Sequence, residues 1–211
     1  NKIKMAIRTA VNRALTAITA LPTAAALVNG NLTLLTTATA SSSATLDFTS
    51  SIDSTYDSYL FKIIDVHPAT DNVSFNVNFR DGSSAYDATK TTTSFRAYQL
   101  ENDGGAGLDY DGTDLAQGTG VQALTGDSNI GNGNDECLSG ELVLFNPSST
   151  TFVKHFIART NYYESRNRSY NPYVAGYCNV TAAIDGVQFS MSSGNIDSGT
   201  IKMYGVGDKQ S

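Results

Sequence analysis

Alternation between apolar and polar residues dominates the chain from about residue 44 onward. In the run VSFNVNF (residues 73–79), every second side chain is apolar and the intervening ones are Ser or Asn. This period of two is typical of a strand with one buried and one exposed face. The preceding run YLFKIIDV (residues 59–66) is apolar on both faces, which predicts a strand covered from both sides.

Seven further β-rich runs are separated by turns rich in Gly, Asn, Pro and Ser; they cover residues 45–50, 94–101, 140–145, 151–159, 173–180, 185–191 and 199–206. Together, the short strands predict a mainly β fold, an antiparallel β-sandwich. Their uneven spacing favours a jelly-roll-like or other Greek-key order. The segment between Glu101 and Gly140 is rich in Gly, Asp and Asn, and we expect it to be a long functional or mobile loop.

The first 20 residues follow a different period. Apolar residues recur there about every fourth position, which predicts an amphipathic helix whose stripe is Ile3, Ile7, Val11, Leu15 and Ile18. Pro22 ends this helix. The next stretch is rich in Thr, Ala and Ser and predicts an extended connector with a short strand near Leu32 to Thr37. We therefore expect two parts, an anchoring segment at residues 1–40 and a sandwich at residues 41–211, with the apolar stripe making the assembly contact.

Charge divides the chain in the same way. Residues 1–40 carry four Lys or Arg and no Asp or Glu, whereas the whole chain has a net charge of −6. An acidic protein is a poor match for a phosphate backbone, so we expect no nucleic-acid partner. No apolar run reaches the 18 or so residues of a membrane-spanning helix, so we expect no membrane span. Because the sequence does not begin with Met, we leave open whether residue 1 is the true N-terminus.

Candidate chemistry is sparse. The chain has two His and contains no GxSxG, HExxH or Walker motif, which predicts a protein that is not an enzyme. Asp109, Asp111 and Asp114 are spaced closely enough to suggest Ca²⁺ ligands, but they do not follow the EF-hand order, and turn aspartates are the better interpretation. We expect no cofactor. Cys137 and Cys178 fit no metal-binding spacing, and free thiols and a disulfide both remain open.

Tyrosine is prominent, with 11 Tyr and no Trp in the chain. Several Tyr and Arg gather in and around the run NYYESRNRSYNPY, and they form a candidate recognition surface: Tyr162, Tyr163, Arg166, Arg168, Tyr170 and Tyr173. Such residues suit stacking on sugars or packing against a protein partner. The alternative interpretation is a hairpin whose rings cover the end of the sandwich.

Two segments carry a resemblance to a known family. The run FSMSSGNIDSGTIKMYGVGDK (residues 189–209) and the run from Thr49 to Ser84 resemble small β-sandwich virion proteins of tailed bacteriophages, especially marine and cyanobacterial phages. The resemblance implies a tail fibre, an adaptor or a capsid decoration, commonly trimeric, with other virion proteins as partners. Location on the tail or on the capsid stays open.

The resulting hypothesis is a structural protein on the surface of a phage particle. It attaches through its N-terminal segment and displays the sandwich outward. A lectin-like module that binds host-surface glycans is the alternative. A polysaccharide depolymerase would need a converging pair of carboxylates, which the sequence does not single out.

Overall fold

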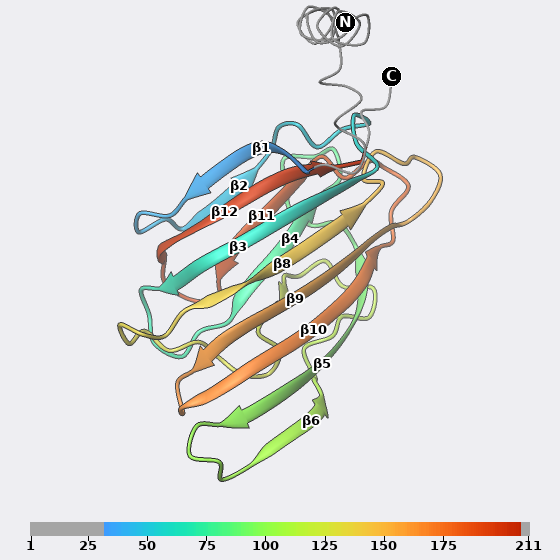
Figure 1. The fold of residues 1–211 in the computed structure, drawn as a ribbon. Helices are drawn as coiled ribbons and strands as arrows, with labels where there is room; N and C mark the ends of the chain where they lie inside the picture. The colour runs from blue at the N-terminus through green and yellow to red at the C-terminus, as the bar shows by residue number, and fades with distance from the viewer. Residues whose placement is uncertain (1–31, 208–211) are drawn as a thin grey trace, which may run out of the picture.

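The computed structural model describes residues 32–207, which form two antiparallel sheets. The larger sheet has eight strands, in the order β1 (Leu32–Thr39), β12 (Ile196–Val206), β3 (Ser58–Pro68), β8 (Leu138–Phe145), β9 (Lys154–Glu164), β10 (Arg168–Cys178), β5 (Lys90–Leu100) and β6 (Ala106–Tyr110). The smaller sheet has four, in the order β2 (Thr45–Phe48), β11 (Gly186–Met191), β4 (Phe75–Arg80) and β7 (Gln122–Ala123). Figure 1 shows the smaller sheet behind part of the larger one. The described chain is therefore all-β, as the alternation predicts.

Aromatic side chains from both sheets meet between them. Phe189 of β11 stacks on Phe75 of β4 at 5.7 Å between ring centroids. It also packs against Phe61 of β3, at 5.7 Å, and against Phe48 of β2, at 6.1 Å. All four rings are buried. Because Phe61 belongs to the larger sheet and the other three to the smaller one, this cluster joins the two sheets.

The strand at residues 73–79 is more buried than its alternation predicts. The apolar residues Phe75, Val77 and Phe79 lie in the core, but Asn76 and Asn78 on the opposite face are also buried. The Asn78 side chain donates a hydrogen bond of 3.3 Å to the backbone oxygen of Thr119. The chain after β6 thus covers the polar face of β4, and backbone carbonyls satisfy the amide.

The segment between Glu101 and Gly140 is not simply a loop over the surface. It contributes β6 and β7, and two of its apolar residues, Leu124 and Ile130, are fully buried. Thr160 of β9 donates a hydrogen bond of 2.6 Å to the Leu124 backbone oxygen, and Tyr162 donates one of 2.8 Å to the Thr125 backbone oxygen. This segment covers the inner face of the larger sheet beside the smaller sheet.

The expected boundary near residue 40 does not coincide with the start of the sheet. β1 ends at Thr39, and its residues pair with β12 from Leu32↔Val206 to Thr39↔Thr200. The short strand expected near Leu32 to Thr37 is therefore part of the sandwich. The helix expected over residues 1–20, with its stripe Ile3, Ile7, Val11, Leu15 and Ile18, lies outside the described residues.

Candidate functional site

Most of the exposed large apolar residues of the described chain lie on the outward side of the larger sheet. Ten large apolar or aromatic residues of the described chain are exposed. By strand alternation, eight of them point outward from this sheet: Leu32, Leu34, Ile64, Phe95, Leu108, Tyr110, Phe145 and Ile157. Exposed apolar residues that gather on one face can mark an interaction site. We call this surface the outer face.

A continuous row of side chains crosses the outer face from β3 to β6. Strand pairing places the following residues next to one another: Lys62, Glu141, Arg159, Tyr173, Phe95 and Tyr110. Tyr173 and Phe95 stack with their ring centroids 4.9 Å apart and nearly parallel, at 4°. The Arg159 guanidinium lies over the Tyr173 ring, 5.1 Å from its centroid. Cross-strand stacking and cation–π contacts fix these side chains relative to one another.

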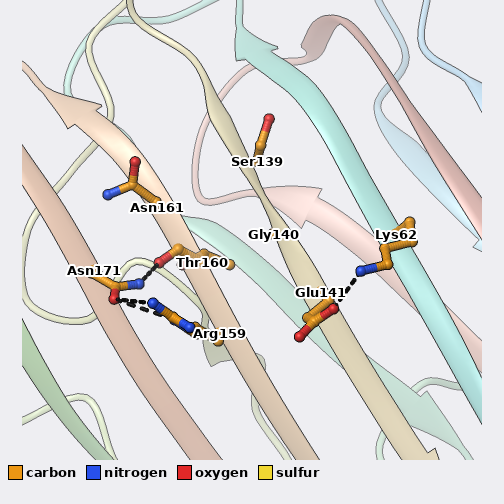
Figure 2. Close-up of a pocket in the computed structure, with 8 residues that line it drawn as sticks. All are labelled: Lys62, Ser139, Gly140, Glu141, Arg159, Thr160, Asn161 and Asn171. Atoms are coloured by element: carbon orange, nitrogen blue, oxygen red, sulfur yellow. Dashed lines mark hydrogen bonds and ion pairs between the residues drawn. The ribbon is translucent and has the colours of Figure 1, made fainter.

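A polar groove of about 320 Å³ opens beside this row (Figure 2). It is lined by Lys62, Ser139, Gly140, Glu141, Arg159, Thr160, Asn161 and Asn171. Its residues come from four adjacent strands, β3, β8, β9 and β10. The volume is at the lower end of the range for small-ligand sites.

Arg159 is oriented by Asn171 from the next strand. The Asn171 side-chain nitrogen donates a hydrogen bond to the Thr160 backbone oxygen, which turns its Oδ1 toward Arg159. This Oδ1 accepts hydrogen bonds from Arg159 Nε at 3.3 Å and Nη2 at 3.2 Å (Figure 2). One edge of the guanidinium is therefore occupied, and no described residue pairs with its Nη1.

Some of the other polar groups of the groove have hydrogen-bond partners within the protein, and others do not. Lys62 and Glu141 Oε2 form an ion pair at 2.5 Å. The Asn161 nitrogen donates to Ser169 Oγ at 3.1 Å and to the Tyr170 backbone oxygen at 2.7 Å. Within residues 32–207, Asn161 Oδ1 and Glu141 Oε1 accept no hydrogen bond from the protein. The groove thus presents a free cationic donor and two free oxygen acceptors.

The tyrosine-rich hairpin is divided between the two faces of the sheet. Tyr163 and Tyr173 point to the outer face, whereas Tyr162 and Tyr170 are buried on the inner face and stack at 5.7 Å. The surface role expected for Tyr162 and Tyr170 is therefore wrong, because adjacent residues alternate across a strand. The interpretation as rings that cover the sandwich describes these two correctly.

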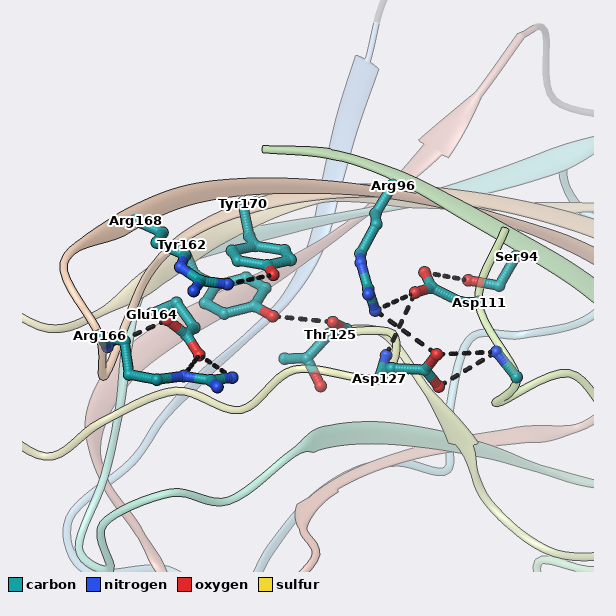
Figure 3. A network of polar contacts seen from close by, with 11 residues as sticks. Ser94, Arg96, Asp111, Thr125, Asp127, Tyr162, Glu164, Arg166, Arg168 and Tyr170 are labelled. Atoms are coloured by element: carbon teal, nitrogen blue, oxygen red, sulfur yellow. Dashed lines mark hydrogen bonds and ion pairs between the residues drawn. The ribbon is translucent and has the colours of Figure 1, made fainter. Parts of the chain in front are cut away.

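The two arginines of the hairpin are held by neighbours from the same hairpin or the adjacent strand. Arg166 forms an ion pair with the buried Glu164 at 2.8 Å. The Arg168 guanidinium lies 5.7 Å from the centroid of the Tyr98 ring, and its Nη1 donates to the Tyr170 hydroxyl at 3.3 Å. Figure 3 shows both arginines beside the buried tyrosine pair. They stabilise the hairpin and are not part of the polar groove.

Arg159, Asn161 and Asn171 were not among the residues singled out from the sequence. The alternation in β9 runs without interruption from Lys154 to Tyr162. Extending the period of two from His155 would have placed Ile157, Arg159 and Asn161 on one face. The position of Asn171 depends on the register between β9 and β10, which the sequence does not reveal.

In the acidic segment that suggested Ca²⁺ ligands, the buried carboxylate is neutralised by an arginine. Asp111 is fully buried and forms an ion pair with Arg96, and it accepts a hydrogen bond from Ser94 Oγ at 3.1 Å (Figure 3). Asp127 Oδ2 lies 3.5 Å from the same Arg96 nitrogen. Asp114 instead accepts a hydrogen bond from the Tyr110 hydroxyl. The three aspartates do not converge, and residues 32–207 contain no group of three His, Cys, Asp or Glu side chains suited to a metal.

Two buried lysines flank Cys178. Lys154 Nζ donates to the backbone oxygens of Val180 and Ala182 at 2.6 and 2.5 Å. Lys90 Nζ donates to the Ala88 oxygen at 2.9 Å. Burial lowers the pKa of Lys90 to about 8 and raises the pKa of the Cys178 thiol to about 12. Cys137 and Cys178 are both free thiols, which settles the disulfide alternative.

The lowered pKa of Lys90 predicts a pH-dependent stability. Between pH 8 and 9, folded Lys90 has begun to lose its proton while unfolded Lys90 keeps it, because its ordinary pKa is 10.5. The unfolded state then binds more protons, so stability rises with pH, by about 1 kcal/mol over this interval. Urea unfolding of the wild type and of Lys90→Met across this interval should show a rise in the wild type that exceeds the change in the variant by about 1 kcal/mol. An equal pH dependence in both proteins would contradict this assignment.

Comparisons with known proteins do not place the chain in a family. No family model matches it, and no curated protein does. A protein of unknown function from Bacteroides ovatus matches at a TM-score of 0.27 and 3% identity, over 50% of this chain and 45% of its own. The A. japonicus protein CB05 matches at a TM-score of 0.32 and 13% identity. The match covers 89% of this chain but only 27% of that protein. A homodimeric agglutinin from chicken liver matches at a TM-score of 0.23 and 9% identity. The match covers 79% of this chain and 96% of the agglutinin. Scores this low carry no argument about activity.

Within residues 32–207, no helix is long and apolar enough to cross a membrane.

Proposed function

We propose that the protein is a non-catalytic surface component of a tailed-phage particle, which attaches through its N-terminal segment and displays the sandwich outward. The two segments that resemble phage virion proteins support this proposal. They are far apart in sequence, yet they pack together, because β3 pairs with β12 and β4 pairs with β11. The resemblance therefore covers two neighbouring strands in each of the two sheets.

Strand order adds support from the fold. Strands β1, β12, β3 and β8 form half of the larger sheet, and β2, β11, β4 and β7 form the smaller one. Successive strands largely alternate between these two sets, with the hairpins β5–β6 and β9–β10 as additions that widen the larger sheet. We infer a jelly-roll-like arrangement, which is common in viral capsid and lectin domains. This is an analogy of fold, and the role itself rests on the surface.

The observation that carries the proposal is the outer face, with its exposed apolar residues and polar groove. The described chain begins at Leu32, which pairs with Val206, so both described ends lie at one end of the sandwich. Val206 pairs in turn with Ser58, and Ser58 pairs with Phe145, so these residues lie at the same end of the sandwich. From Phe145 to Ser139 at the groove, β8 extends by about 20 Å. An N-terminal attachment would therefore place the groove about 20 Å from the attached end of the sandwich, clear of the point of attachment.

A lectin-like role in host recognition is the second candidate, and the groove favours it. Free donors and acceptors beside aromatic side chains are the chemistry that binds the hydroxyl groups of sugars. The two candidates are compatible, because a displayed virion protein can recognise a host glycan. We also propose a homo-oligomer, with a trimer favoured, located on the surface of the particle.

Removing residues 1–20 is expected to abolish incorporation into particles, because this segment carries the attachment. The test supplies the full chain or the truncated chain during particle assembly and quantifies each in purified particles by mass spectrometry. We expect at least a tenfold loss for the truncated chain, about 1.4 kcal/mol or more in attachment. Circular dichroism and light scattering of both proteins control for folding and oligomeric state.

Normal incorporation of the truncated chain would contradict the attachment role. Absence of the full chain from particles would contradict the virion assignment altogether.

A further inference from the structure

Arg159 is an unneutralised cation in an acidic protein. The chain has a net charge of −6, and the carboxylate opposite Arg159 across the sheet, Glu141, is already paired with Lys62 at 2.5 Å. No ion pair joins Arg159 to any described carboxylate. Its guanidinium is held in place by an amide and an aromatic ring, neither of which removes its charge.

The free part of this guanidinium has a defined shape. Asn171 Oδ1 occupies the edge formed by Nε and Nη2, at 3.3 and 3.2 Å. The end of the fork, with one N–H from each terminal nitrogen, is left available. Two parallel N–H groups match the two oxygens of a carboxylate, and this bidentate pairing is stronger than a hydrogen bond between neutral groups.

The other unengaged groups of the groove are oxygen acceptors, so a ligand must supply hydrogen-bond donors to them. Both contacts of the Asn161 side-chain nitrogen are made within the protein, and its Oδ1 is left as an acceptor that no residue of the described range engages. Glu141 Oε1 is a second acceptor, next to the ion pair with Lys62. A ligand that satisfies all three groups carries one carboxylate and several hydroxyl groups within a few ångströms.

We propose that the groove binds a carboxylated saccharide, of the uronic-acid class, with its carboxylate on the free fork of Arg159 and its hydroxyls on Asn161 and Glu141. A uronic acid places a carboxylate and hydroxyl donors on one ring, and the groove of about 320 Å³ accommodates one such ring. This assignment rests on the glycan-binding candidate for the same groove and names its ligand class.

Calorimetric titration of the full chain tests the assignment with two matched ligands, trigalacturonate and its methyl ester. The ester has the same sugar rings without the charge. We expect the acid to bind at least about tenfold more tightly, since hydrogen bonds to charged groups are the stronger ones. Arg159→Lys keeps the positive charge but loses the fork, and it should weaken binding of the acid by about tenfold.

Lys202→Gln is the matched control. Lys202 pairs with Lys62 in the same row of the outer face but does not line the groove. Its removal should change the dissociation constant by less than about twofold, because a separated surface charge is screened by salt. Circular dichroism of each variant confirms that it is folded.

Each other outcome overturns a defined part of the assignment. Equal binding of acid and ester, or unchanged binding by Arg159→Lys, would overturn the carboxylate contact and leave glycan binding intact. Equal binding of hexaglutamate would overturn the saccharide class. Failure of the wild type to bind either trisaccharide would overturn this assignment, while the virion proposal would stand on its own test.

Discussion

Phe189→Ala is expected to destabilise the protein by about 3–5 kcal/mol, the usual cost of removing a buried phenylalanine ring. Phe189 is fully buried and contacts three other aromatic rings, on Phe48, Phe61 and Phe75. Because Phe61 belongs to the opposite sheet, the cavity would open where the two sheets join. Urea unfolding followed by circular dichroism measures the loss as a lower midpoint at an unchanged slope.

Phe152→Ala is the control for this prediction. Phe152 is 71% exposed and lies in the turn before β9. Its replacement should change the free energy of unfolding by no more than about 0.5 kcal/mol. Equal effects of the two substitutions would mean that the aromatic cluster does not hold the sheets together.

Arg96→Met is expected to cost about 3–5 kcal/mol, because it leaves the Asp111 carboxylate buried without a charged partner. Asp111 is completely buried, and burial raises its pKa while the Arg96 guanidinium lowers it. Without Arg96, the pKa of Asp111 rises further. The folded variant then takes up a proton that the unfolded chain lacks, so the loss of stability should shrink as the pH falls toward the pKa of Asp111.

Two comparisons make this second prediction specific. Arg96→Met combined with Asp111→Asn removes the buried charge and should recover at least half of the loss. Lys62→Met breaks an ion pair whose side chains are 42% and 44% exposed, and it should cost about 1 kcal/mol or less. A small effect of Arg96→Met that does not depend on pH would show that the network of Figure 3 is not electrostatically important.

The strands could be predicted from the sequence where apolar residues alternate with polar ones or form a short apolar run. The runs at residues 59–66 and 185–191 correspond closely to β3 and β11. The segment between Glu101 and Gly140 was misjudged for a physical reason. Two of its apolar residues, Leu124 and Ile130, lie outside any long apolar run, and they become core only because this segment folds back over the larger sheet.

The candidate site was harder to predict than the fold. The number of tyrosines suggested a surface site, but Tyr162 and Tyr170 lie on the inner face of their strands and are buried. The groove depends on Arg159 and Asn171, which are on different strands and meet only through strand register. Common residue types such as Arg and Asn carry no signal until that register is known.

Imaging of intact particles by electron cryomicroscopy tests the central claim most directly. The account predicts the chain on the exterior of the particle, attached through residues 1–40. It also predicts that the outer face around Ile157 and the groove at Arg159 are directed away from the particle. Absence of the chain from the exterior, or an outer face buried against the particle with the N-terminal segment pointing away from it, would contradict the account.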